Sequence, residues 1–163
     1  MVWHWHTIAG PNEGKGETIT VNNKIVGYKL EGQGFTDDKY FNSRPSAAGY
    51  NAAASGASNK GPSNPDYLKE VQNRIDTFMV HNPSVKKSDI PSELVTASGS
   101  GLDPDLSPQG ACVQVPRIAK ARNIAKEKIN ALLAEQIQKP LLGLFGPERV
   151  NVLKLNIKLD ELK

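Results

Sequence analysis

The stretch NSRPSAAGYNAAASGASNKGPSNP, residues 42–65, contains no Leu, Ile, Val, Phe or Met in 24 positions. Loops of this length without regular structure are uncommon in compact domains, and they are usually either functional or disordered. Leu, Ile, Val and Phe make up 39 of the 163 residues, which is above the disordered range but modest for a globular domain. We therefore expect a small core surrounded by long surface segments.

Within this stretch, Gly56 and Gly61 have the G-x-x-x-x-G spacing of a phosphate-binding loop. Such a loop needs a lysine directly after the second glycine, but that position is Pro62, which has neither a charge nor an N–H group. Lys60 lies on the other side of Gly61, and residues 50–55, YNAAAS, do not resemble a buried strand. The pattern favours an ordered turn that leads into a helix over a nucleotide site.

Composition and charge limit the class of protein. A net charge of +3 is too small to indicate a nucleic-acid partner. The single cysteine, Cys112, excludes an intrachain disulfide and a multi-cysteine metal site. No apolar run approaches the roughly 20 residues that cross a bilayer, and no signal peptide is visible. We expect the chain as it stands to be soluble.

The first half of the chain predicts a hairpin and a helix. The stretches TITV and KIVGYKL flank Asn22 and Asn23, which tolerate the left-handed backbone of a tight turn, and we predict strands at about 17–22 and 24–31. Asn64 can cap a helix whose first residue is Pro65 and which ends before Pro83. Its apolar side chains recur at helical spacing, and we expect them to belong to the core: Leu68, Val71, Ile75, Phe78 and Met79.

The second half adds two helices and two strands. Residues 92–97 suggest a short strand, and residues 98–110 form a second polar loop. Ser107 and Pro108 predict the start of a short helix, and residues 124–138 predict a longer one. Alternating apolar residues after position 149 predict a half-exposed strand with a bulge near 152–153. The fold class is therefore α+β: one domain, residues 17–163, in which a small mixed or antiparallel sheet is covered by about three helices, with two long ordered polar loops.

Candidate metal and catalytic residues are few. His4 and His6 flank Trp5 and could share a metal, but structural zinc sites usually need four ligands. Asp103 and Asp105 could supply oxygens to a cation, although the further ligands of a calcium loop are missing. Ser98 and Ser100 do not fit the G-x-S-x-G pattern of a hydrolase nucleophile. Six basic residues between positions 115 and 139 face two acidic ones, and we interpret them as a solvated surface or a contact with an acidic protein or membrane: Arg117, Lys120, Arg122, Lys126, Lys128 and Lys139.

Three blocks of sequence resemble a known family. RPSAAGYNAAASGASNKGPSNP, LVTASGSGLDPDLSPQGACVQVPRIAKARN and LFGPERVNVLKLN occur in the order found in the C subunit of the Kdp potassium-transporting ATPase. The resemblance extends from about residue 32 to residue 159. Because three separate blocks match in order, the resemblance is specific.

The resemblance implies a non-catalytic accessory subunit of a bacterial four-part membrane complex. Its partners would be a channel-like potassium-translocating subunit and an ATP-hydrolysing subunit, with no nucleic acid. ATP and Mg would bind the hydrolysing subunit rather than this chain, and potassium would be the transported ion. The family is proposed to support assembly and to act as a catalytic chaperone that raises the ATP affinity of the hydrolysing subunit. It is located at the bacterial inner membrane, with the domain facing the periplasm or cell exterior.

The family typically has one N-terminal membrane helix, which we do not find here. Residues 1–16 are therefore expected to be a flexible leader, or an engineered remnant of the end of that helix. Trp3 and Trp5 would also suit a membrane interface.

The two polar loops are expected to form the partner-facing or loop-shaping surface. Arg44 could make a forked contact with a partner, or could hold the loop to its own domain. The alternatives are a cation- or solute-binding module and a small hydrolase that uses Asp103 or Asp105. The candidate residues are Arg44, Pro45, Asn59, Pro62, Asn64, Ser98, Ser100, Asp103, Asp105 and Pro108.

Overall fold

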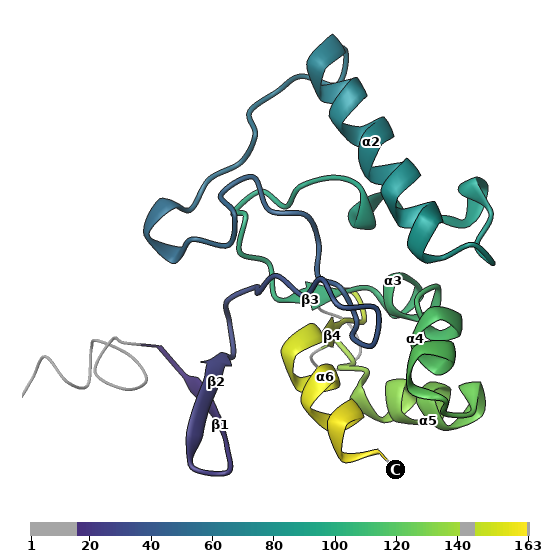
Figure 1. The fold of residues 1–163 in the computed structure, drawn as a ribbon. Helices are drawn as coiled ribbons and strands as arrows, with labels where there is room; N and C mark the ends of the chain where they lie inside the picture. Colours follow the sequence, from purple (N-terminus) through teal and green to yellow (C-terminus); the bar gives the residue numbers. More distant parts are fainter. Residues whose placement is uncertain (1–15, 141–145, 163) are drawn as a thin grey trace, which may run out of the picture.

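The computed structural model describes residues 16–140 and 146–162. Four helices gather around a short strand pair: α3 (Pro108–Cys112), α4 (Val115–Arg122), α5 (Lys126–Gln136) and α6 (Val152–Glu161). Figure 1 shows α2 (Pro65–His81) apart from this group, and a hairpin that projects on the other side. The first 15 residues lie outside the described ones, and with them His4 and His6, which were weighed as metal ligands, the two tryptophans and nearly all of the predicted leader.

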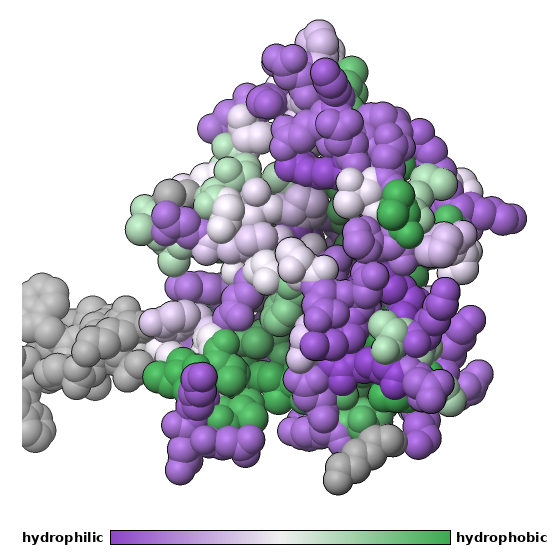
Figure 2. Space-filling view, viewed as in Figure 1, coloured by the Kyte–Doolittle hydropathy of each residue, from purple (hydrophilic) through white to green (hydrophobic). Residues whose placement is uncertain are grey.

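The hairpin consists of β1 (Thr18–Val21) and β2 (Lys24–Tyr28), which pair antiparallel. Asn22 and Asn23 both have positive φ, 49° and 61°, as the two central residues of a type I′ turn require. This confirms the hairpin prediction. Ile25 is 61% exposed and Leu30, just beyond β2, is 71% exposed. Figure 2 shows apolar surface gathered near the hairpin.

The core lies between the four gathered helices. β3 (Asp105–Leu106) pairs antiparallel with β4 (Val150–Asn151), and places Leu106 opposite Val150 at its centre. The helix predicted at residues 124–138 is confirmed as α5, which buries Ile129, Leu132 and Leu133. The largest fully buried apolar side chains are Phe41, Leu106, Ile118, Ile129, Val150, Val152, Leu155 and Leu159. The α+β class is also confirmed, and its sheet is divided into two antiparallel strand pairs.

The C-terminal strand prediction was wrong. Pairing stops after Asn151, whose side-chain oxygen accepts a hydrogen bond from the Lys154 N–H at 3.1 Å and so caps α6. Leu155 and Leu159, one turn apart, are both fully buried, whereas Ile157 is only half-buried. The alternating leucines satisfied a strand pattern and a helix pattern equally. Packing against α5 selects the helix, in which Leu and Lys are favourable, and the expected bulge is the point where strand becomes helix.

The strand expected at residues 92–97 was also wrong. The segment instead forms a 3-10 turn, η4 (Ser92–Leu94). Thr96 donates both its backbone N–H, at 2.9 Å, and its hydroxyl, at 2.8 Å, to the Ser92 carbonyl. A local side-chain hydrogen bond thus closes a turn where propensity favoured a strand.

Helix α2 begins as predicted but does not enter the core. The Asn64 side chain accepts a hydrogen bond from the Tyr67 N–H at 3.1 Å, and Pro65 is the first helical residue. No described side chain of α2 is buried, however, and Leu68 is 53% exposed. Phe78 packs against the edge of the core. The apolar stripe was misread because α2 lies apart from the helices around the core (Figure 1), so that of its predicted core residues only Phe78 packs against the core.

Candidate functional site

The two polar loops pair with one another. The Ser98 N–H donates to the Pro45 carbonyl at 3.2 Å, and the Gly56 N–H donates to the Ser100 carbonyl at 2.9 Å. The Ser55 hydroxyl reaches the same Ser100 carbonyl at 3.0 Å. Backbone groups that a long loop would otherwise leave to water are thereby satisfied. We call the paired residues 44–56 and 98–103 the loop platform.

Arg44 and Asp103 connect the two halves of the platform. The guanidinium lies 2.9 Å from the Asp103 carboxylate, and the two side chains are 25% and 31% exposed. The other carboxylate oxygen of Asp103 accepts from the Asp105 N–H at 3.1 Å. Arg44 therefore makes the internal contact that was one of its two expected roles. Its Nε atom is buried and has no hydrogen-bond partner among the described residues.

Two residues with positive φ shape the platform, one in each loop. Tyr50 has a φ of 59°, and its hydroxyl donates to the Arg44 carbonyl at 2.7 Å. Gly101 has a φ of 71°, and a Cβ atom there would lie 3.0 Å from the Gly56 carbonyl oxygen. Only glycine fits both this backbone conformation and this space. The sequence analysis missed both residues, although Gly101 in a SGSG run was a detectable turn signal.

The platform is anchored to the core by two amides. Asn156 accepts from the Phe41 N–H at 2.8 Å and donates to the Phe41 carbonyl at 3.0 Å. Gln114 binds the N–H and carbonyl of Asn42 in the same way, at 2.8 and 3.2 Å. Both amides are buried. The two amides make the backbone hydrogen bonds that a neighbouring strand would otherwise make with Phe41 and Asn42 at the start of the first loop.

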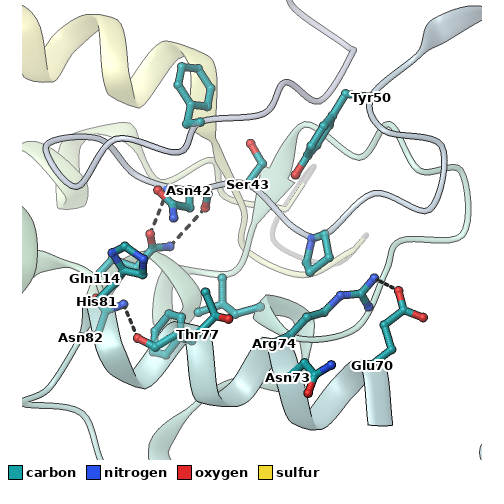
Figure 3. A pocket seen from close by; sticks show the side chains of 14 residues that line it. Asn42, Ser43, Tyr50, Glu70, Asn73, Arg74, Thr77, His81, Asn82 and Gln114 are labelled. Atoms are coloured by element: carbon teal, nitrogen blue, oxygen red, sulfur yellow. Dashed lines mark hydrogen bonds and ion pairs between the residues drawn. The ribbon is translucent and has the colours of Figure 1, made fainter. Parts of the chain in front are cut away.

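A cavity of about 350 Å³ lies between the platform and α2. Figure 3 shows Asn42, Ser43 and Tyr50 on the loop side, facing Arg74 and Thr77 of α2. Arg74 pairs with Glu70 and donates to the Val95 carbonyl at 3.2 Å. Arg74 and Glu70, two charged residues of the cavity lining, are therefore already paired with each other.

The remaining predicted residues shape the chain around the platform. Asn64 caps α2, and Pro108 is the first residue of α3 after the Ser107 cap. Asn59 has a φ of 51° and, like Pro62, lies in the exposed turn before α2. The Gly56 N–H of the supposed phosphate loop is already donated to Ser100. The interpretation of that glycine pattern as an ordered turn agrees with this geometry.

Arg117 was expected on a solvated surface, and that was wrong. The residue is 7% exposed. Its guanidinium donates to the Asn82 side chain at 3.1 Å, the Asp38 carbonyl at 2.9 Å and the Gln114 side chain at 2.8 Å. Burial lowers the pKa of Arg117 from its ordinary value, opposed chiefly by the charge of Asp38. The flanking apolar residues of α4 were the only signal that this position faces inward.

Asp105 lies at the edge of the platform, on β3. Burial raises the pKa of its carboxyl above the ordinary value, although Arg149 and a hydrogen bond from Asn151 act in the opposite direction. The folded protein thus binds this proton more tightly than the unfolded chain. The stabilisation from Asp105 is full below its unfolded pKa of about 3.9 and is lost as the pH rises through the higher folded value.

We therefore expect the Asp105→Asn variant to gain stability relative to the parent protein as the pH rises from about 4 to 7. Urea unfolding of both proteins across this range measures the difference. Asp37 also has a shifted pKa, which the hydrogen bond from the Lys39 N–H lowers. Because Asp37 is present in both proteins, its contribution cancels in the difference between their free energies of unfolding. A difference that does not change with pH, or that shrinks as the pH rises, would contradict this account of Asp105.

Asp103 and Asp105 do not form part of a larger acidic cluster. Among residues 16–140 and 146–162, no three His, Cys, Asp or Glu side chains form a group that could hold a metal ion. In the same ranges, no helix has the length and apolar character needed to cross a bilayer.

Comparison with known proteins identifies the family. Residues 1–161 match the family described as KdpC, the K+-transporting ATPase c chain. A potassium-transporting ATPase KdpC subunit of Bacteroides fragilis is 54% identical over all of this chain and 86% of its own length. One from Flavobacterium psychrophilum is 58% identical over 94% of this chain and 82% of its own length. A third, from Bacillus cereus, is 54% identical over 86% of this chain and 72% of its own length. Because these matches cover nearly the whole chain, it belongs to the KdpC family, whose members are accessory subunits of the potassium-transporting Kdp ATPase.

Proposed function

We propose that the loop platform is the surface through which this chain supports assembly and coupling of the Kdp complex. The observation that carries the proposal is the mutual pairing of the two loops, which yields an ordered polar surface outside the core. Such a surface offers fixed donors and acceptors to a partner. Ordering it beforehand lowers the entropy lost on binding.

The proposed partners are the potassium-translocating subunit and the ATP-hydrolysing subunit. In this proposal the domain faces the cell exterior at the membrane. ATP and Mg are held by the hydrolysing subunit, and this chain raises the affinity for ATP indirectly. Pro62 at the lysine position and the engaged Gly56 N–H support an indirect role over a nucleotide site in this chain.

The test is purification of the complex with Arg44→Ala or Asp103→Ala in this chain. Each variant removes the same partly exposed ion pair, which is worth up to about 1 kcal/mol, or roughly a fivefold change in an equilibrium. We expect both variants to reduce co-purification of the other subunits and to raise the KM for ATP by up to that factor. ATPase assays and subunit ratios on gels measure the two effects.

Lys69→Ala, on the exposed face of α2, is the control and should change neither quantity. Normal assembly and an unchanged KM in both platform variants would refute the proposal. A larger effect of Arg44→Ala than of Asp103→Ala would show that Arg44 also touches a partner, since only the first removes the cation.

A further inference from the structure

A second concave surface lies away from the platform, between the end of α2, α4 and the start of α5. This cleft has a volume of about 640 Å³. We call it the basic cleft. Its lining residues are Asp38, Val80, His81, Asn82, Pro83, Ser84, Pro116, Arg117, Lys120, Ala121 and Lys126.

The charges of the cleft are unbalanced. Lys120 and Lys126 are exposed, and neither has an ion-pair partner in the described ranges. The one carboxylate in the lining, Asp38, is shared between His81 at 2.8 Å and Arg117 at 3.5 Å. The cleft therefore has two uncompensated cations at its mouth.

The floor adds a third cation. The Arg117 side chain is 3% exposed, and its nearest carboxylate belongs to the half-exposed Asp38. Its other hydrogen bonds go to neutral oxygens, which satisfy its N–H groups without supplying a counter-charge. An anionic group that entered the cleft would meet a positive potential in partly desolvated surroundings, where charge interactions are stronger than in bulk water.

The walls of the cleft are apolar. Val80 is 77% exposed, and Pro83, Pro116 and Ala121 complete the apolar part of the lining. A free anion would make no use of these side chains. No Phe, Tyr or Trp lines the cleft, and the one imidazole in the lining, that of His81, is paired with Asp38, so the cleft offers nucleic-acid bases little to stack on. A flat bilayer surface does not fill a concave site.

We propose that the basic cleft docks an acidic segment of a partner protein, whose carboxylates lie against Lys120 and Lys126 and whose aliphatic side chain packs on Val80 and the two prolines. Charge complementarity and the apolar walls together select this occupant. The inference rests on the proposed function, because the partner is another subunit of the assembled complex. It assigns that partner a second contact, separate from the loop platform.

Carbodiimide cross-linking of the purified complex is the direct test, since this reagent joins a lysine amine to a carboxylate in contact with it. We expect mass spectrometry to find a bond from Lys120 or Lys126 to an Asp or Glu of another subunit. In the Lys120→Arg, Lys126→Arg double variant the bond should disappear while the subunits still co-purify, because the charge is kept but the amine is lost. Absence of any intersubunit bond from these lysines in the parent complex would overturn the proposal.

Charge reversal gives an independent readout. The Lys120→Glu, Lys126→Glu variant should lose at least half of its co-purifying subunits at raised salt. The control, Lys69→Glu with Lys139→Glu, changes the net charge equally on exposed positions outside the cleft and should retain them. Equal retention in both variants would overturn the proposal, as would binding of the isolated chain to vesicles containing anionic lipid that depends on Lys120 and Lys126.

The outcomes also separate this inference from the proposed function. If the parent chain does not co-purify with the other subunits, both proposals fall. If it co-purifies, and the platform variants weaken assembly while the cleft variants do not, only the docking inference fails.

Discussion

Replacing Leu155 with alanine is expected to lower the free energy of unfolding by about 3 kcal/mol, because large-to-small substitutions in a packed core cost roughly 2–5 kcal/mol. Leu155 is fully buried on the inner face of α6, where it belongs to the same core as Ile118 and Ile129. Truncation would remove its contacts and leave a cavity among side chains that have little room to close it. Urea unfolding followed by circular dichroism gives the difference.

Ile157→Ala is the matched control. Ile157 follows Leu155 by two positions, and a strand would place both side chains on the same face. In α6 the side chain of Ile157 is only half-buried, so we expect a loss below about 1 kcal/mol, in line with substitutions outside the core. Equal losses at the two positions would contradict the helix and would restore the strand that the sequence pattern predicted.

The second large effect is expected at Arg117. Changing it to alanine should cost about 3–5 kcal/mol, the usual result of removing one partner from a buried charged network. The substitution leaves the buried side-chain oxygen of Asn82 without its donor, and the buried oxygen of Gln114 keeps only the Asn42 N–H. It also removes the hydrogen bond between Arg117 of α4 and Asn82, the residue that follows α2. A drop in the thermal midpoint of the isolated chain, with a matching decrease in urea resistance, measures the loss.

Lys120→Ala serves as the control for Arg117, because it removes a cation from the same helix at an exposed position. Its effect on stability should stay within about 0.5 kcal/mol. If Arg117→Ala were as mild as this control, the buried hydrogen bonds of the guanidinium would contribute nothing measurable, and their assignment would be wrong.

Local signals in the sequence predicted local structure well. The Asn22–Asn23 pair specified the hairpin turn, and the Asn64 and Ser107 caps specified the starts of α2 and α3. Each of these features is decided by a few neighbouring residues, whose backbone preferences and side-chain hydrogen bonds act within one turn. The family resemblance rested on three blocks of sequence that include both polar loops, and the comparisons confirm it.

Features that depend on distant partners could not be predicted. Periodicity gave α2 an apolar face but could not show that the helix lies outside the core, with none of its described residues buried. The excess of basic residues between positions 115 and 139 placed Arg117 on the surface. Nothing in the local sequence reveals that its guanidinium donates hydrogen bonds to Asn82 and Gln114. The contact between Arg44 and Asp103 joins residues 59 positions apart, and the sequence offered it only as one of two roles for Arg44.

The bond between Asn156 and the backbone of Phe41 has a consequence for biosynthesis. The two residues are 115 positions apart in the sequence. During translation the first loop therefore emerges from the ribosome long before the side chain that fixes its entrance exists. Until α6 has emerged, the first loop has only the Gln114 anchor, so we expect nascent chains that stop before Asn156 to be more sensitive to proteases in this loop than chains that include α6.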